Sequence, residues 1–387
     1  MSDLAGNPYA SIVELSKAYL NKSVSPSEVT KAQLARIDIL DAKLGSYQTI
    51  YGDEALAAAR AADKAYTEDA RLGPFHGIPF ALKDIYELKG QITTCGSYEM
   101  RQRISIETGT VVRRLLEVGG IAIGKTKTVE CALGGWGTNE HMGTPWNPWD
   151  LEHPRVPGGS SSGSGVAVAS GLASCATGSD TGGSVRLPAA YCGLTGLKVS
   201  KACLPTDGIM PLSQTLDTPG PMTRNMPDLA LMFSVMKGID GRKIEIDMMN
   251  GDGLFNIQMN IFKGLKFGII DQKERSRCTE DILKSYDATL NLLVDLGAEL
   301  EVFTSPIAYD DMAQFNGAIT MYEGYHNHRH LYDNPSKIMD QNVKKRMLVG
   351  RDITPEKHAN LLSKRQDHQL IFKNAMTDFD ALITPTI

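Results

Sequence analysis

The 387-residue chain lacks the features that mark several classes of protein. No apolar run approaches the roughly 18 residues of a membrane span, and residues 1–10 lack the charged-then-apolar pattern of a secretion signal. The formal net charge is −5 and no basic block occurs, which argues against a nucleic-acid-binding surface. We therefore expect a cytoplasmic protein with no membrane segment and no direct contact with nucleic acid.

Cysteine is scarce and shows no pair spacing. This predicts reduced, buried thiols rather than a disulfide or zinc framework at Cys95, Cys131, Cys175, Cys192, Cys203 and Cys278. His326 and His330 are four residues apart, with His328 between them, and this spacing can hold a metal. The carboxylate pattern of a metalloprotease does not accompany them, which favours a solvated helical face. We expect no metal and no cofactor.

The pattern of segments predicts an α/β fold with a largely parallel sheet, because strands and helices alternate after a helical region at 1–70. Ser25 and Pro26 form a helix start. No linker forces a split, so we expect one domain, 1–387. The predicted helices are Glu28–Ala42, Gly52–Thr67, Thr110–Val118, Gly163–Gly171, Thr279–Leu296 and Thr354–Phe379. The predicted strands are Ile78–Leu82, Ile121–Ile123, Ala173–Thr177, Leu265–Ile270, Glu299–Phe303 and Asp380–Thr384.

Two serines, Ser160 and Ser184, each follow a Gly-Gly pair. A nucleophilic serine needs a sharp turn and free N–H groups aimed at the oxyanion, and glycine allows both. A flexible linker has a similar composition, so one such run alone would be weak support.

Lys83 ends the short apolar run Ile78–Leu82. Lysine is rarely fully buried, so this residue either marks where a strand meets solvent or is a desolvated base. The run by itself favours the first interpretation.

Three elements stand in the order seen in the amidase signature family, which this chain resembles: Gly77–Asp84, Pro157–Ser164 and Gly178–Arg186. The stretches Cys192–Lys198 and Leu216–Met222 also look like that family. The resemblance runs from about Tyr9 to the end of the chain and reverses the interpretation of Lys83. It implies a large mixed, mostly parallel central sheet with helices on both faces.

By this resemblance Ser184 is the nucleophile, Ser160 a bridging residue with a cis peptide bond to Gly159, and Lys83 the base. A neutral lysine accepts a proton from Ser160, which accepts one from Ser184, so the chemistry needs no histidine. The expected activity is hydrolysis of a small-molecule carboxamide or anilide through an acyl-enzyme. The resemblance further implies an oxyanion hole from the backbone N–H groups of Thr181, Gly182, Gly183 and Ser184.

Residues beside the motifs are candidates for substrate contacts. Arg186 either braces the loop by pairing with Asp180 or meets a substrate carboxylate, and bracing is favoured. The glycine-rich stretch that holds Gly134, Gly135 and Trp136 resembles the family's pocket wall. Trp136 contacts an apolar group of the substrate or packs in the core. Ser161, Ser162, Ser164 and Ser179 are expected to be hydrogen-bonding scaffold.

Two alternatives to a free-standing amide hydrolase stay open. One is the A subunit of the glutamyl-tRNA amidotransferase, which shares all three motifs but follows its Gly-Leu-Lys with Tyr-Gly-Arg, where this chain has 199–205 instead. The other is a truncated, inactive member, because the chain stops at Ile387, before the usual C-terminal segment. The resemblance allows a homodimer. The sequence does not identify the substrate.

Overall fold

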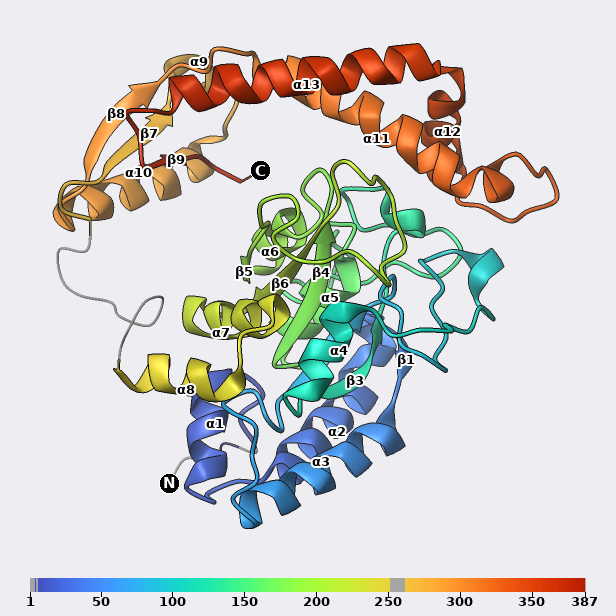
Figure 1. Cartoon of the computed structure of the whole chain (residues 1–387), viewed down its shortest axis with the longest axis vertical. Helices are drawn as coiled ribbons and strands as arrows, with labels where there is room; N and C mark the ends of the chain where they lie inside the picture. The colour runs from blue at the N-terminus through green and yellow to red at the C-terminus, as the bar shows by residue number, and fades with distance from the viewer. Residues whose placement is uncertain (1–3, 5, 251–261, 387) are drawn as a thin grey trace. The chain divides into compact units, whose positions relative to one another are not determined.

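The computed structural model describes residues 4, 6–250 and 262–386 (Figure 1), with the backbone alone for 246–250. The chain divides into two compact units, Met1–Phe255 with Thr320–Arg351, and Asn256–Ile319 with Asp352–Ile387. A six-stranded sheet lies in the first unit and a three-stranded sheet in the second.

The helices of the described residues are α1 (Ile12–Leu20), α2 (Pro26–Leu44), α3 (Gly52–Thr67), α4 (Thr110–Glu117), α5 (Ser162–Ala169), α6 (Arg186–Cys192), α7 (Met226–Lys237), α8 (Gly241–Asn250), α9 (Gln272–Arg275), α10 (Glu280–Asp295), α11 (Tyr309–Tyr332), α12 (Gln341–Val349) and α13 (Pro355–Ala375). Short 3-10 turns are η1 (Tyr98–Met100), η2 (Glu130–Ala132) and η4 (Gly350–Asp352). The strands are β1 (Tyr47–Ile50), β2 (Pro79–Lys83), β3 (Ile121–Thr126), β4 (Cys175–Asp180), β5 (Thr195–Gly196), β6 (Thr218–Thr223), β7 (Lys266–Ile270), β8 (Glu299–Phe303) and β9 (Ala381–Ile383).

The large sheet has the strand order β1-β3-β2-β4-β6-β5. β2 runs parallel to both of its neighbours, β3 and β4, so the carboxyl ends of these three strands meet at one edge. β1, β5 and β6 pair antiparallel. In the second unit β7 is parallel to β8 and β9. The mixed sheet predicted for this α/β chain is confirmed.

Helices cover both faces of β2, as its alternating side chains show. Phe80 and Leu82 join a core cluster with Val112 of α4 and Leu231 of α7. Ala81 joins a different cluster, which contains residues of α2 and α5. Because side chains alternate between the two faces of a strand, these two clusters lie on opposite sides of the sheet. All five residues of β2 are therefore buried.

Most expected elements are present, with shifts at their ends. The helix at Gly52–Thr67 and the strand at Glu299–Phe303 have the predicted bounds. The expectation of an all-helical region at 1–70 was wrong at Tyr47–Ile50, which forms β1 because it pairs antiparallel with β3. The predicted strand at Ala173–Thr177 lies two to three residues further on, as β4.

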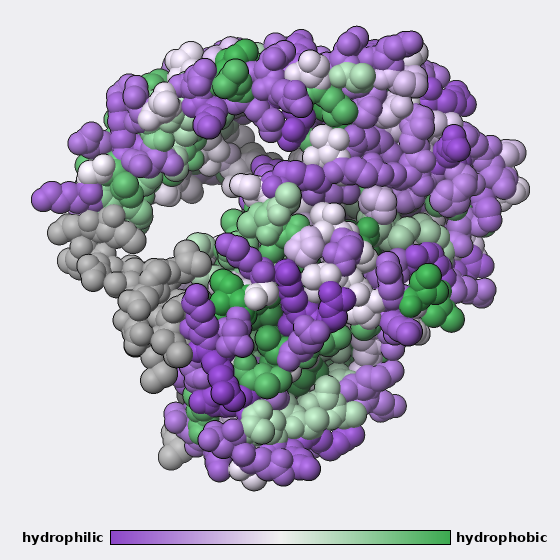
Figure 2. All heavy atoms as spheres, in the orientation of Figure 1, coloured by the Kyte–Doolittle hydropathy of each residue, from purple (hydrophilic) through white to green (hydrophobic). Residues whose placement is uncertain are grey.

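The second unit presents polar helical surface. No residue of α13 is buried, and Figure 2 shows mostly hydrophilic side chains over this helix. Tyr286 of α10 donates its hydroxyl hydrogen to the carbonyl of Ile383 at 2.7 Å, which ties this helix to β9. Every helix in the described part of the chain is too short or too polar to span a bilayer.

One close backbone approach fixes the start of α5 beside the large sheet. A Cβ at Gly163 would overlap the Ser46 carbonyl oxygen and the Lys127 backbone, whereas Gly52 has open space around its Cα. We predict that Gly163→Ala lowers the free energy of unfolding by about 1–3 kcal/mol, as overpacking does. Gly52→Ala, the matched control, stays within about 0.5 kcal/mol of wild type. Urea denaturation measures both; equal stability of the two variants would contradict the close approach.

Candidate active site

Lys83 is fully buried at the carboxyl end of β2. Its Nζ donates to Ser160 Oγ at 2.7 Å and to Ser179 Oγ at 2.8 Å. Burial lowers the pKa of Lys83 to about 7, because desolvation penalises the ammonium form, although Cys95, Asp217 and Asp180 act in the opposite direction. The lysine is therefore available as a neutral base near neutral pH.

The neighbouring strand β4 supplies contacts that the sequence interpretation missed. Thr177 Oγ1 accepts from the Lys83 backbone N–H at 3.0 Å, and Ser179 Oγ accepts from its Nζ. Ser179 was expected to be scaffold, yet it contacts the lysine as directly as Ser160 does. Thr177 and Ser179 are two residues apart on a strand and so share one face. The spacing of two between Thr177 and Ser179 was the signal in the sequence that both side chains lie on the same face of β4.

Ser160 sits in a tightly packed turn before α5 and is fully buried. The Gly159–Ser160 peptide bond is cis, as the resemblance implied. The carbonyl oxygen of Ser160 accepts from Thr128 Oγ1 at 2.9 Å and from the Val129 N–H at 3.3 Å. The turn after β3 thus holds Ser160 in front of Lys83.

Ser184 lies near Ser160 through the backbone, since its carbonyl accepts from the Ser161 N–H at 3.2 Å. Its side chain is largely buried, with the whole residue 8% exposed. Among the described residues, no hydrogen bond joins its Oγ to Ser160. The structure thus brings Lys83 and Ser160 into direct contact and holds Ser184 beside them without the second hydrogen bond of the relay.

Asp180 and Arg186 brace the loop that carries Ser184. The guanidinium donates to Asp180 through Nε at 3.0 Å and Nη2 at 2.8 Å, which is the bracing pair that the sequence favoured. Asp180 also accepts from the Gly183 N–H at 2.8 Å and the Val185 N–H at 3.2 Å. Burial alone would raise the pKa of Asp180, but the hydrogen bonds and charge of Arg186 bring it below its ordinary value. The carboxylate is therefore ionised.

The expected oxyanion donors, Thr181, Gly182 and Gly183, lie in this braced turn. Gly183 has φ +126°, a left-handed value that favours glycine. Its N–H already donates to Asp180. Thr181 is held by a hydrogen bond of 2.5 Å from its Oγ1 to Asp217. The turn is thus rigid on both sides of Gly182.

The glycine-rich stretch at 134–137 packs on the turn that carries Ser160. A Cβ at Gly159 would lie 2.6 Å from the Gly134 carbonyl oxygen and from the Gly137 nitrogen, so only glycine fits there. Gly134 and Gly135 are half-buried, and Trp136 is 63% exposed. The alternative in which Trp136 packs in the core was therefore wrong, because its ring lies at the surface.

The histidines of α11 do not converge. His328 is buried and its Nε2 lies 2.7 Å from the Pro211 carbonyl, so the expected solvated face holds for His326 and His330 only. No group of three or more His, Cys, Asp or Glu side chains suited to a metal occurs among the residues the structure describes. All six cysteines are free thiols, as predicted, but the expected burial was wrong for Cys203 and Cys278, which are half-buried.

A family model described as "Amidase" matches residues 28–387. The chain belongs to the amidase family. Enzymes of this family act on carbon–nitrogen bonds, and the match includes the three motifs that carry Lys83, Ser160 and Ser184.

Similar proteins include components of a larger enzyme. The A subunit of the glutamyl-tRNA(Gln) amidotransferase from Alkaliphilus metalliredigens is 31% identical to this amidase-family chain, covering 97% of the chain and 81% of the relative. Its counterpart from Geobacter metallireducens is 33% identical, with coverages of 97% and 81%. A crystal structure of an amidase superposes with a TM-score of 0.85 at 26% identity, covering 97% of this chain and 82% of that protein.

The burial of Lys83 generates a direct prediction about its titration. We expect its amine to lose its proton with a midpoint near pH 7, whereas an ordinary lysine titrates near about 10.4. Nuclear magnetic resonance of 13C,15N-lysine-labelled protein reports each Cε and Nζ, and the Lys83→Met variant assigns the resonance. Surface lysines serve as internal controls. A Lys83 midpoint above pH 9 would mean that water reaches the amine.

Proposed function

We propose that this amidase-family chain hydrolyses the C–N bond of small carboxamides or anilides through a serine acyl-enzyme. The observation that carries the proposal is the 2.7 Å hydrogen bond between the buried Lys83 amine and Ser160, with Ser184 on the adjoining turn. A lysine without bulk water around it can be neutral near pH 7, and a neutral amine accepts protons.

The reaction then follows from proton transfer along Lys83, Ser160 and Ser184. Ser160 gives its proton to Lys83 Nζ and takes the proton of Ser184, whose Oγ attacks the substrate carbonyl carbon. The tetrahedral oxyanion accepts hydrogen bonds from the backbone N–H groups of Thr181 and Gly182. Gly183 is left out of this role, because its N–H donates to Asp180. Collapse breaks the C–N bond, and the proton returns through Ser160 to the leaving amine. Water, activated by the same relay, releases the carboxylic acid and regenerates Ser184.

A small cleft lies beside Ser179. Its lining combines Ser179, Thr181 and Asp217 with the apolar side chains of Ile85, Ala132, Ile209, Met210 and Leu212. The cleft has room for little more than a water molecule, so the proposed substrate class rests on the resemblance to amidases and not on this lining. Arg186 is paired with Asp180, so this proposal gives it a bracing role and leaves apolar contacts to the wall at Gly134, Gly135 and Trp136.

The A subunit of a glutamyl-tRNA(Gln) amidotransferase is the second candidate. Relatives with that name are 31% and 33% identical to this chain over alignments that cover 97% of it. In this role the same serine and lysine would release ammonia from glutamine, and other subunits would be partners. The departure of residues 199–205 from the Tyr-Gly-Arg pattern favours the first candidate.

A covalent probe tests the proposed nucleophile. We predict that a fluorophosphonate adds its mass once to wild type, that Ser184→Ala abolishes labelling, and that Lys83→Ala slows it by about 100-fold or more. Ser162→Ala is the matched control, because Ser162 lies in the same serine run but contacts the Lys127 carbonyl. Intact mass spectrometry gives the result, with circular dichroism to check folding. A folded wild type that stays unlabelled would refute the serine mechanism.

Substrate turnover separates the two candidate functions. We predict that the purified chain alone releases aniline from acyl anilides or ammonia from aliphatic amides, and that Ser184→Ala does not. Glutamine is tested in parallel, alone and with any chains that copurify from the native cells. Glutamine hydrolysis that requires such chains, with no turnover of anilides or simple amides, would favour the amidotransferase role instead.

A further inference from the structure

A second lysine is fully buried next to the catalytic strand. Lys125 of β3 has no exposed surface, and Asp84, which directly follows Lys83, is 1% exposed. Their charged atoms, Lys125 Nζ and Asp84 Oδ1, are 3.5 Å apart. The proposed mechanism uses neither residue. A buried ion pair of this kind has a high desolvation cost, so its position invites a functional explanation.

A register shift between β2 and β3 puts the two lysines on opposite faces of the sheet. Phe80 pairs with Ala122, but Ala81 pairs with Gly124, and Lys125 therefore pairs with Leu82. Without the shift, Lys125 would pair with Lys83 and share its face. Instead, Lys83 lies on the face of α5, and Lys125 lies with Leu82 on the face of α4 and α7.

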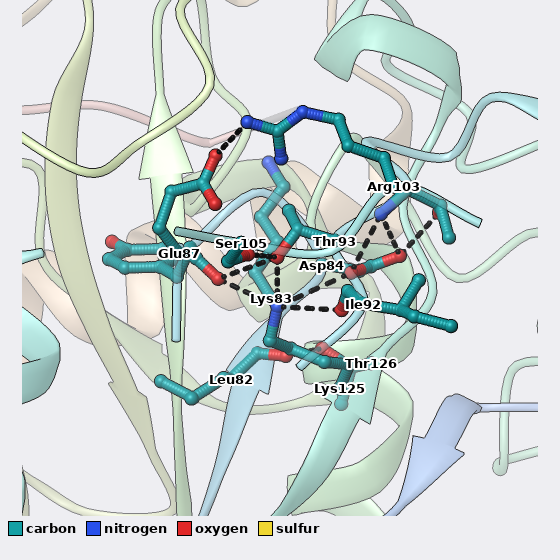
Figure 3. Close-up of polar contacts among 12 residues, drawn as sticks. Leu82, Lys83, Asp84, Glu87, Ile92, Thr93, Arg103, Ser105, Lys125 and Thr126 are labelled. Atoms are coloured by element: carbon teal, nitrogen blue, oxygen red, sulfur yellow. Dashed lines mark hydrogen bonds and ion pairs between the residues drawn. The ribbon is translucent and has the colours of Figure 1, made fainter. Parts of the chain in front are cut away.

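The Lys125 amine is surrounded by hydrogen-bond acceptors. Its Nζ lies 2.6 Å from the Tyr86 carbonyl, 3.4 Å from the Ile92 carbonyl and 2.7 Å from Thr93 Oγ1 (Figure 3). Carbonyl oxygens only accept, so these contacts require protons on Nζ. Desolvation lowers the pKa of Lys125, while Asp84 raises it. The Tyr86 and Ile92 carbonyls and Asp84 Oδ1 together match the three N–H donors of the charged form.

Asp84 is surrounded by donors in the same way. Both of its oxygens accept from the Thr94 N–H at 3.2 Å, and the Thr94 hydroxyl donates to Oδ2. Burial raises the pKa of Asp84, and Lys125 and Thr94 oppose this change. Because N–H and O–H donors stabilise the ionised form, we treat Asp84 as a carboxylate.

The Lys125–Asp84 pair is linked through Tyr86 to β4, the strand whose Ser179 contacts Lys83. The Tyr86 carbonyl binds Lys125, while the Tyr86 hydroxyl donates to the Gly178 carbonyl at 2.6 Å, directly before Ser179. The Asp84 carbonyl accepts from the Cys95 N–H at 2.9 Å. The turn at 84–95, which adjoins Lys83, is therefore held around the Lys125 ammonium.

Other charges near these groups are compensated separately. Glu87 and Arg103 form their own ion pair at 2.6 Å (Figure 3). Asp180 is paired with Arg186, and Asp217 accepts from Thr181 and two backbone N–H groups. Among the described residues, Tyr51 and Cys95 are further titratable groups whose pKa the Asp84 charge raises. Lys125 is thus the cation that balances Asp84.

We propose that Lys125 is a positioning residue for Lys83. It balances the Asp84 carboxylate and anchors the 84–95 turn, so that no uncompensated charge adjoins Lys83 where it contacts Ser160 and Ser179. The assignment rests on the proposed function, in which Lys83 acts as the base. It predicts that removing either partner of the pair changes the titration of Lys83, in opposite directions.

The experiment titrates Lys83 by nuclear magnetic resonance in wild type, Lys125→Gln, Asp84→Asn and the double variant. Gln keeps donors for Tyr86 and Thr93 but removes the charge, which leaves Asp84 unbalanced and favours protonated Lys83. In Lys125→Gln the midpoint of the Lys83 titration therefore rises, by roughly half to one pH unit. Asp84→Asn leaves the Lys125 ammonium unbalanced, and the midpoint falls by a similar amount. The double variant returns close to wild type.

Fluorophosphonate labelling of Ser184 gives the functional readout. Lys125→Gln is expected to label roughly two- to fivefold more slowly at pH 7 and to regain the wild-type rate at pH 9, because deprotonation of Lys83 then is complete. A residue that only supports the fold would lower the rate equally at every pH. If Lys125→Gln does not fold, Asp84→Asn alone tests the role of Lys125, and the Lys83 midpoint in that variant must fall.

The failures of the two hypotheses are distinguishable. Lys83 midpoints that coincide in wild type and the folded variants would overturn the role of Lys125, even if wild type is labelled at Ser184. Midpoints that separate as expected while wild type stays unlabelled would uphold the charge balance and refute the serine mechanism instead.

Discussion

The removal of water from the Lys83 amine is the constraint on which the rest of the site depends. A lysine at an edge strand or a sheet surface would keep its proton at neutral pH and could not act as a base. Here β2 has a parallel strand on each side and a core cluster on each face, which leaves no solvent path to Nζ. The topology of the sheet is thus a condition for the proposed chemistry as well as a scaffold for it.

Low polarity around one lysine imposes a second condition on its neighbours. In such surroundings an unbalanced charge acts over a longer range than in water. Asp180 is matched by Arg186 and Asp84 by Lys125, at 2.8 and 3.5 Å. Lys83 itself has no carboxylate at hydrogen-bonding distance among the described residues, and its two partners are neutral hydroxyls. The two ion pairs and the unpaired amine are parts of one charge arrangement.

Local patterns in the sequence predicted much of the fold but little of what surrounds the base. Amphipathic and alanine-rich segments gave helices close to α2, α3, α4 and α10, because their signals lie within a few residues. β1 was missed, since it forms by pairing with β3, more than 70 residues away. The contacts of Lys83 with Ser160 and Ser179 likewise depend on tertiary packing. The motifs named Lys83, Ser160 and Ser184, but only the structure pointed to Lys125, through a register shift that no local pattern encodes.

The chemistry of the site is easier to infer from the sequence than its substrate, because local patterns encode the first and tertiary packing determines the second. Proton transfer depends on a few atoms whose residue types and spacing form a recognisable pattern. Selection of an anilide, an aliphatic amide or glutamine depends on the walls of the cleft, where Ile85, Ala132 and Met210 come from three separate segments. Apolar residues of this kind occur throughout any core, so their types alone do not predict a substrate site before the folded structure brings them together. The proposed hydrolase and the alternative amidotransferase role would therefore use the same Lys83 site and would differ in the substrate that is admitted to it.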